Sequence, residues 1–198
     1  RGILVDAAPY DFSSTALTSR YLRHQIRLPN YSLEPDLWLE CLSAAIIEHD
    51  YDLVIPCDDR AILPLIQHRS ELPTTNYALP NTRAFEVFFD KALTRGTAAR
   101  LNVPIAKGRL LNTADTDAQT LAREIPLPVA IKPRKSYELE NTGSRQNVEI
   151  VHDLETLQGL LDEIRDKSHY LIEQLFPGYG VGVSVLASKG KISLAFQH

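Results

Sequence analysis

Two isolated lysines and one acid are the residues of this sequence whose surroundings best fit a chemical role. Lys91 stands in the segment FFDKAL, Lys132 in PVAIKPR and Glu173 in YLIEQLFPG. Lysine is scarce, with seven residues against fourteen arginines, and an apolar strand such as VAI at residues 129–131 normally excludes it, because burying an unpaired ammonium is unfavourable. A bound anion would remove that penalty, and a compact ammonium suits phosphate oxygens. The pattern therefore predicts a phosphate-binding site that includes both lysines.

Each of these residues also has an ordinary structural explanation. A lysine at the end of a strand can extend its ammonium into solvent, and Lys91 by itself would fit a solvated helix. Asp58 and Asp59 follow the strand DLVIP at its carboxyl end, where open α/β sheets bind ligands, but helix capping by Asp59 is the favoured interpretation. The two lysines and the later acid, taken in this order, favour a ligand site more strongly than any one of them does.

The remaining polar and aromatic residues favour structural roles. The histidines show no spacing typical of metal ligands. Trp38 and the phenylalanines of FEVFF, at residues 85–89, fit a hydrophobic core better than a stacking surface. Cys41 and Cys57 have neither metal-type nor disulfide-type spacing, so free thiols are expected.

Composition and charge exclude several classes of partner. The 198 residues are 44% hydrophobic, which allows one or two domains. The formal net charge is -4 and the basic residues are scattered, so no nucleic-acid partner is expected. No stretch approaches the roughly 20 apolar residues that a membrane span needs. We therefore expect no membrane partner and a cytoplasmic location, while the oligomeric state is not predicted.

Residues 1–82 predict a Rossmann-like domain with a parallel sheet. Strands are expected in ILVDA, DLVIP and YALP, and helices in STALTSRYLR, PDLWLECLSAAIIEHD and AILPLIQHRSEL. Short apolar strands that alternate with amphipathic helices indicate βαβ units. No GxGxxG motif is present, so a dinucleotide-binding oxidoreductase would need one upstream of Arg1.

Residues 83–198 predict an α+β lobe with the order β-α-β-β-α-β. Thr82 is expected to cap a first helix, and Asp90 a second helix with Lys91 in its first turn. Strands follow in IAKGRLL, PVAIKPR, VEIVH and HYLIEQL, and helices in TDAQTLAREI and, behind Asp153, in LETLQGLLDEIRDK. GVSVLA and KISLAF predict a hairpin. Because the chain starts and stops within apparent strands, we expect an N-terminal fragment of a larger protein.

The segments DLVIPCDD, FFDK, AIKP and LIEQLFPG resemble the ATP-grasp superfamily and, within it, the carbamoyl phosphate synthetase-like ligases. The resemblance covers most of the chain. It implies a Rossmann-like pre-ATP-grasp domain at residues 1–82 and the first, incomplete part of an ATP-grasp domain at residues 83–198. It also implies that Lys91 and Lys132 contact the phosphates of ATP. A hinge would bind adenine and a loop would cover the phosphates: Glu173, Gln174, Leu175 and Phe176 for the hinge, Gly143 and Ser144 for the loop.

Three features depart from the family pattern. The loop KSYELENTGSRQN has one glycine and contains Glu138 and Glu140, whose charges would repel phosphate, although neighbouring arginines and Lys135 could compensate. Gly180 and Gly182 stand where other members carry side chains near the ribose, so no ribose ligand is assigned. The magnesium-binding carboxylates and the catalytic arginine of the family would lie beyond residue 198. No catalytic or metal-binding residue is therefore expected in this fragment.

The resemblance implies an ATP-dependent carbon–nitrogen ligase in the full-length parent. ATP and Mg²⁺ would be the cofactors, a small carboxylate would be activated as an acyl phosphate, and an amine or related nucleophile would be joined to it. The fragment by itself is expected to be inactive. The alternative is a non-catalytic nucleotide-binding or sensor module, which the glycine-poor, acidic loop suggests.

Overall fold

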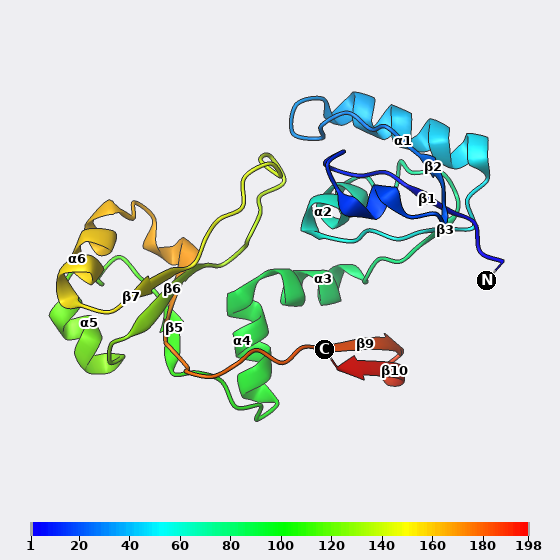
Figure 1. Ribbon diagram of the computed structural model, residues 1–198. Coiled ribbons are helices and arrows are strands. Elements are labelled where there is room, and N and C mark those ends of the chain that lie inside the picture. Colours follow the sequence, from blue (N-terminus) through cyan, green and yellow to red (C-terminus); the bar gives the residue numbers. More distant parts are fainter. Residues whose placement is uncertain (1, 198) are drawn as a thin grey trace.

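The computed structural model describes residues 2–197 and contains two hydrophobic cores (Figure 1). The first core belongs to the N-terminal lobe, and its buried members are Tyr31, Trp38, Leu42, Ile46 and Leu65. The second core lies between a four-stranded sheet and two helices. Trp38 is therefore a core residue, as the sequence predicts.

The N-terminal lobe consists of short parallel strand pairs and two helices. Its elements are β1 (Val5–Ala7), the 3₁₀ helix η1 (Thr15–Thr18), β2 (Leu22–Gln25), α1 (Pro35–His49), β3 (Leu53–Val54), α2 (Asp59–Gln67) and β4 (Asn76–Tyr77). β1 pairs with β2 and β3 pairs with β4, both in parallel. Parallel pairing agrees with the prediction, but the hydrogen bonds divide these strands into two pairs rather than one sheet.

The helix predicted in STALTSRYLR is wrong. That segment forms only the short η1 and then enters β2, which pairs with β1. Its hydroxyl residues bond to nearby backbone, since Thr18 Oγ1 donates to the Thr15 carbonyl at 2.8 Å and Ser19 Oγ accepts from Tyr21 N at 3.3 Å. Such local bonds compete with a continuing helix.

Two capped helices, α3 (Thr82–Phe89) and α4 (Lys91–Arg100), connect the lobes. Asn81, not Thr82, caps α3, because its side chain accepts from Ala84 N at 2.9 Å. Asp90 caps α4 as predicted and accepts from the backbone N–H groups of Ala92 and Leu93 at 2.8 and 3.3 Å. This cap fixes Lys91 as the first residue of α4.

The second lobe has the predicted β-α-β-β-α-β order. Its elements are β5 (Gly108–Leu110), α5 (Ala118–Glu124), β6 (Val129–Pro133), β7 (Glu149–Val151), α6 (Leu154–Glu163), the 3₁₀ helix η2 (Lys167–His169) and β8 (Tyr170–Gln174). The spatial order is β5-β8-β6-β7, with antiparallel neighbours throughout. Asp153 caps α6 through Thr156 N at 2.8 Å, which confirms that prediction.

Strand register places the candidate residues on one face of this sheet. Ile131 pairs with Ile172, and both lie in the second core beneath α5 and α6. Ala130 pairs with Glu173, and Lys132 pairs with Leu171. Because side chains alternate along a strand, Lys132 and Glu173 project together from the face opposite the core.

The chain continues into the predicted hairpin of β9 (Val183–Ser188) and β10 (Lys191–Gln197), which lies apart from the four-stranded sheet (Figure 1). Lys189 and Gly190 join the strands with φ angles of 50° and 76°. Two successive positive φ values are typical of a tight hairpin turn, and glycine adopts them most readily.

Candidate functional site

A pocket of about 370 Å³ lies between α4 and the face of the second-lobe sheet that is turned away from its core. It brings together Lys91, Lys132 and Glu173, the three residues that the sequence singles out. The lining residues are Phe88, Lys91, Thr94, Arg95, Ala98, Ile105, Ala106, Lys132 and Glu173. Residues more than 80 positions apart in the chain therefore share one site.

Glu173 is held by two cations. Its Oε2 accepts from Lys132 Nζ at 2.5 Å, and its Oε1 accepts from Arg95 at 2.8 Å. Burial by itself raises the pKa of the Glu173 carboxyl, but the contacts with Lys132 and Arg95 outweigh burial and lower the pKa below its usual value. The carboxylate is therefore ionised at neutral pH and forms an ion pair with the Lys132 ammonium.

Lys91 enters the pocket from the N-terminus of α4. Its ammonium donates to Ser136 Oγ at 3.0 Å, and its backbone N–H donates to the Arg134 carbonyl at 2.9 Å. Burial lowers the pKa of Lys91, and the nearby positive charges of Arg145 and Lys132 lower it further, against an opposing effect of Asp59. An anion placed between Lys91 and these neighbouring cations would offset their mutual repulsion, so Lys91 is suited to bind an anion.

Asp90 and Arg134 fix this arrangement from outside the pocket. Asp90 is 5% exposed and pairs with Arg134 at 2.5 Å, in addition to capping α4. Burial raises the pKa of Asp90, but the Arg134 guanidinium and the two capped N–H groups lower it further than burial raises it. Because Arg134 directly follows β6, the pair ties the start of α4 to the strand that carries Lys132.

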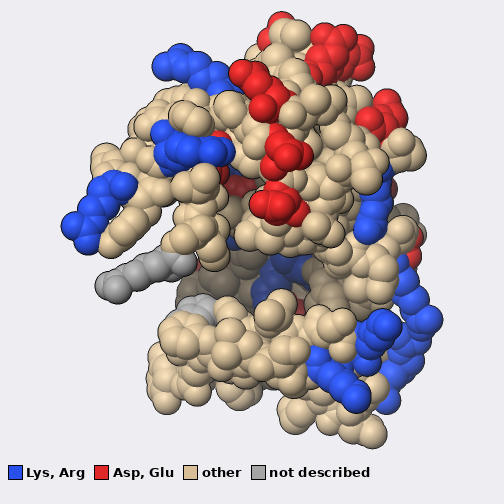
Figure 2. All heavy atoms as spheres, turned by 90° about the vertical axis from the view of Figure 1, so that its right-hand side faces the viewer, with Lys and Arg blue, Asp and Glu red and all other residues tan. Residues whose placement is uncertain are grey.

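Positive charge predominates around the pocket. Among the described residues that line it, Lys91, Arg95 and Lys132 face a single acid, Glu173. Figure 2 shows a hollow on one face of the molecule with Lys or Arg side chains inside it. Cations that converge in a concave, partly desolvated site attract a polyanion such as a phosphate chain.

The glycine-containing part of the predicted phosphate loop lies away from the pocket, although Ser136 at the start of the loop accepts from Lys91. Gly143 and Ser144 are not among the pocket-lining residues, because the segment between β6 and β7 extends toward the N-terminal lobe (Figure 1). Thr142, which is 0% exposed, donates its N–H to Ser32 Oγ at 2.9 Å, and the two hydroxyls are 2.8 Å apart. Leu139 packs against the core of the N-terminal lobe. Packing of Leu139 and the Ser32–Thr142 bonds account for this position.

The predicted hinge directly follows the pocket. The backbone N–H groups of Gln174 and Leu175 donate to the carbonyls of Lys107 and Pro128 at 2.8 and 2.9 Å, so both donors are used within the lobe. The side chain of Phe176 is 83% exposed. Contact of these residues with adenine remains a prediction.

Phe88 of α3 and Arg95 of α4 are among the pocket residues that the sequence interpretation missed. The phenylalanines of FEVFF were expected in the core, but none of them is buried. Phe88 is 78% exposed and lines the pocket, while Phe85 stacks on Phe89 with ring centroids 5.0 Å apart. Arg95 was not singled out. It stands four residues after Lys91, a spacing that places both on one side of a helix and could have indicated it.

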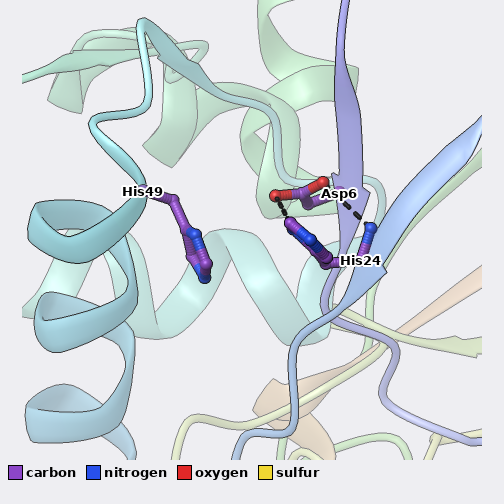
Figure 3. Close-up of side chains that lie close together, drawn as sticks. All are labelled: Asp6, His24 and His49. Carbon is purple, nitrogen blue, oxygen red and sulfur yellow. Dashed lines mark hydrogen bonds and ion pairs between the residues drawn. The ribbon is translucent and has the colours of Figure 1, made fainter.

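A second polar cluster, of Asp6, His24 and His49, lies in the N-terminal lobe (Figure 3). Their potential ligand atoms lie within 4.8 Å of one another, a proximity that sequence spacing did not indicate. However, Arg23 donates to both oxygens of Asp6, at 2.9 and 2.7 Å, and Tyr51 donates to one at 2.7 Å. A metal ion would have to compete with the guanidinium, so this cluster fits a structural role that links β1, β2 and the chain after α1.

The sequence and the fold can be compared with those of known proteins. No protein-family model matches the sequence, and the search of curated proteins found no similar sequence. Biotin carboxylase from Campylobacter jejuni matches with a TM-score of 0.55 and 18% identity, over 86% of this chain and 39% of that chain. N5-carboxyaminoimidazole ribonucleotide synthetase from Thermus thermophilus matches with a TM-score of 0.54 and 15% identity, over 82% of this chain and 38% of that chain.

A third solved structure covers nearly the whole chain. N5-carboxyaminoimidazole synthase from Aspergillus clavatus, solved with ADP and 5-aminoimidazole ribonucleotide, matches with a TM-score of 0.54 and 13% identity, over 96% of this chain and 44% of that chain. Over the matched region, the chain shares its fold with these ATP-grasp proteins. It spans less than half the length of these three ATP-grasp proteins. No helix within residues 2–197 combines the length and apolarity needed to cross a membrane.

Proposed function

We propose that this chain is the ATP-binding portion of an ATP-grasp ligase of the carbamoyl phosphate synthetase-like type. The observation that carries the proposal is the convergence of Lys91 and Lys132 on one pocket beside Glu173. The two lysines would bind the phosphates and neutralise charge as the γ-phosphoryl group is transferred. Residues 1–82 would form the pre-ATP-grasp domain and residues 83–198 the first part of the ATP-grasp domain.

Adenine would bind next to Glu173. The N–H groups of Gln174 and Leu175 are already used, which leaves the Gln174 carbonyl and the Phe176 N–H as the candidate base-reading groups of this segment. The exposed rings of Phe88 and Phe176 and the side chain of Ile105 would supply apolar contact. A carbonyl and an N–H in this order match the amino group and ring nitrogen of adenine, so we expect ATP to bind more tightly than GTP.

The proposed reaction joins a carboxylate to an amine. Transfer of the γ-phosphoryl group from ATP to the carboxylate would give an acyl phosphate and ADP. Attack by the amine nitrogen on the acyl carbon would then form the C–N bond and release phosphate. Of the residues described, Lys91 and Lys132 would act in the first step only, by holding the triphosphate.

Magnesium would lower the negative charge of the triphosphate when bound. The pocket wall formed by the described residues does not fit a magnesium site, because its one carboxylate, Glu173, is already paired with Lys132 and Arg95. We therefore assign no step to the metal.

A lysine substitution tests the proposed site. Lys132→Ala should weaken ATP binding by about 1.5–3 kcal/mol, the usual contribution of a charge-assisted hydrogen bond, or roughly ten- to hundredfold. Lys189→Ala, at the exposed turn between β9 and β10, is the matched control and should leave the affinity unchanged. Titration calorimetry on the full-length protein measures both, and an affinity of Lys132→Ala within twofold of wild type would refute the proposal.

The alternative is a nucleotide-binding module without catalytic activity. The observation that favours it is the position of the acidic loop between β6 and β7: Ser136 at its start contacts Lys91, but Leu139 and Thr142 further along pack on the N-terminal lobe. Such a module would bind ATP in the same pocket without transferring its phosphate. ADP formation by the full-length protein, measured with a panel of carboxylates and amines, distinguishes the two.

A further inference from the structure

In this pocket, the Glu173 carboxylate would compete with a bound phosphate for the Lys132 ammonium. Lys132 Nζ lies 2.5 Å from Glu173 Oε2, so the ammonium of this pocket-lining lysine is paired with a carboxylate in this structure. A phosphate that approached Lys132 would have to draw it away from Glu173. The ease of that transfer depends on what remains paired with Glu173 afterwards.

Arg95 is placed to remain with Glu173. It donates to Oε1 at 2.8 Å, the oxygen that Lys132 does not contact, and its other terminal nitrogen donates to the Ala106 carbonyl. The Ala106 contact anchors the guanidinium to the chain between α4 and β5, so Arg95 need not move when Lys132 does. The side chains of Arg95 and Glu173 are each 16% exposed, so solvent would replace neither partner well.

We propose that Arg95 is a positioning residue that makes Lys132 available to phosphate by neutralising Glu173. This inference deepens the proposed ATP site and rests on it. With Arg95 present, Lys132 can turn to a phosphate oxygen without leaving a nearly buried carboxylate unpaired. Without Arg95, the same movement would leave the partly buried Glu173 carboxylate without a partner, which is unfavourable. Arg95 itself need not touch the nucleotide.

The first test measures the state of Lys132 without any nucleotide. Brief acetylation with acetic anhydride, read site by site by mass spectrometry, reports how freely each lysine amine reacts, with Lys189 as an internal exposed reference. Arg95→Gln should slow acetylation of Lys132 by about three- to tenfold, because Glu173 then pairs with Lys132 alone. Glu173→Gln should accelerate it.

The second test uses inorganic tripolyphosphate, which lacks the base and so isolates the phosphate contacts. Arg95→Gln should weaken its binding by about three- to tenfold. The double variant Arg95→Gln/Glu173→Gln should bind more tightly than Arg95→Gln alone, because the competing carboxylate is gone. Arg95→Lys should recover part of the loss. Arg100→Gln, on the same helix but with an exposed side chain bonded to Thr97, is the matched control and should bind as wild type does.

These measurements separate the inference from the proposed function. Unchanged Lys132 acetylation in Arg95→Gln, or a double variant that binds no better than Arg95→Gln, would overturn the role of Arg95. A wild-type protein that binds neither ATP nor tripolyphosphate would overturn the proposed site, while the acetylation result would still decide whether Arg95 controls Lys132. Circular dichroism of each variant identifies any loss from misfolding, and in that case Arg95→Lys, which keeps the charge, gives the decisive comparison.

Discussion

Asp90→Ala should destabilise the protein more than removal of an ordinary helix cap. Asp90 caps α4 through Ala92 and Leu93 and also pairs with Arg134 at 2.5 Å, while its residue is only 5% exposed. Loss of a capping carboxylate costs about 1 kcal/mol. Loss of the pair leaves Arg134 without its partner, and since about a third of the Arg134 side chain is exposed, we add about 1–2 kcal/mol rather than the full penalty of a buried pair.

The expected total is therefore about 2–3 kcal/mol of unfolding free energy. The matched control is Asp153→Ala, because Asp153 caps α6 in the same way, through Thr156, but has no arginine in its hydrogen-bonding set. Asp153→Ala should destabilise the protein less than Asp90→Ala, because it removes a helix cap alone. The difference between the two variants isolates the Asp90–Arg134 pair.

Urea unfolding followed by circular dichroism measures both variants, and a common m-value shows that only stability has changed. A weaker ATP affinity of folded Asp90→Ala is also expected, because Lys91 begins the helix that Asp90 caps and donates its N–H to the Arg134 carbonyl. The reasoning is refuted if Asp90→Ala unfolds at the same urea concentration as Asp153→Ala.

Three further predictions follow from individual contacts. Gly108→Ala should destabilise the protein by about 1–3 kcal/mol or more and disturb the pocket, because the new Cβ would lie 2.3 Å from the Ile172 carbonyl oxygen and 2.7 Å from Glu173 Cα. Gly159→Ala, with open space in α6, is the control and should be neutral or stabilising. Equal effects of the two variants on thermal unfolding would contradict this prediction. Ser32→Ala should speed hydrogen exchange at residues 136–146, because the buried Thr142 N–H loses its acceptor; unchanged exchange would show that the contact does not hold the loop. Hydrogen bonds from Arg23, and then from Tyr51 and His24, lower the pKa of Asp6 against the effect of its burial. Ionised Asp6 therefore stabilises the fold above its unfolded pKa of about 3.9, and this contribution is lost progressively as the pH falls below about 4. Asp6→Asn should flatten the acid side of a profile of melting temperature against pH, and parallel profiles of variant and wild type would argue against this role.

Much of the second lobe could be predicted because its signals are local. The apolar stripe of α6 behind Asp153, the cap at Asp90 and the short apolar strands around Lys132 and Glu173 each depend on neighbours within a few residues. The order of elements followed directly from them. The helix prediction for STALTSRYLR failed because pairing with β1 decides whether this segment forms a helix or β2. In that pairing Val5 lies opposite Leu22, about 17 residues away in the chain.

The candidate site, too, could be predicted from the sequence only in part. Lys91, Lys132 and Glu173 stand out in the sequence because each charge sits among apolar residues where an unpaired ion would be unfavourable. Nothing in the sequence shows that Lys132 and Glu173 pair with each other, that Arg95 completes the pair, or that Phe88 lines the pocket. These contacts depend on the β6–β8 register and on how α4 packs across the sheet.

The sequence by itself determined which segments become helix or strand in the second lobe and which charges require partners, since both depend on local periodicity, capping and the penalty of burying an ion. The tertiary structure decided which residues pair with those charges. Antiparallel pairing places Glu173 diagonally beside Lys132, and the Asp90–Arg134 pair orients α4. Packing of Leu139 and the bonds of buried Thr142 to Ser32 hold the loop on the N-terminal lobe. Each of these contacts joins residues more than 40 positions apart, and only the folded chain brings such residues together.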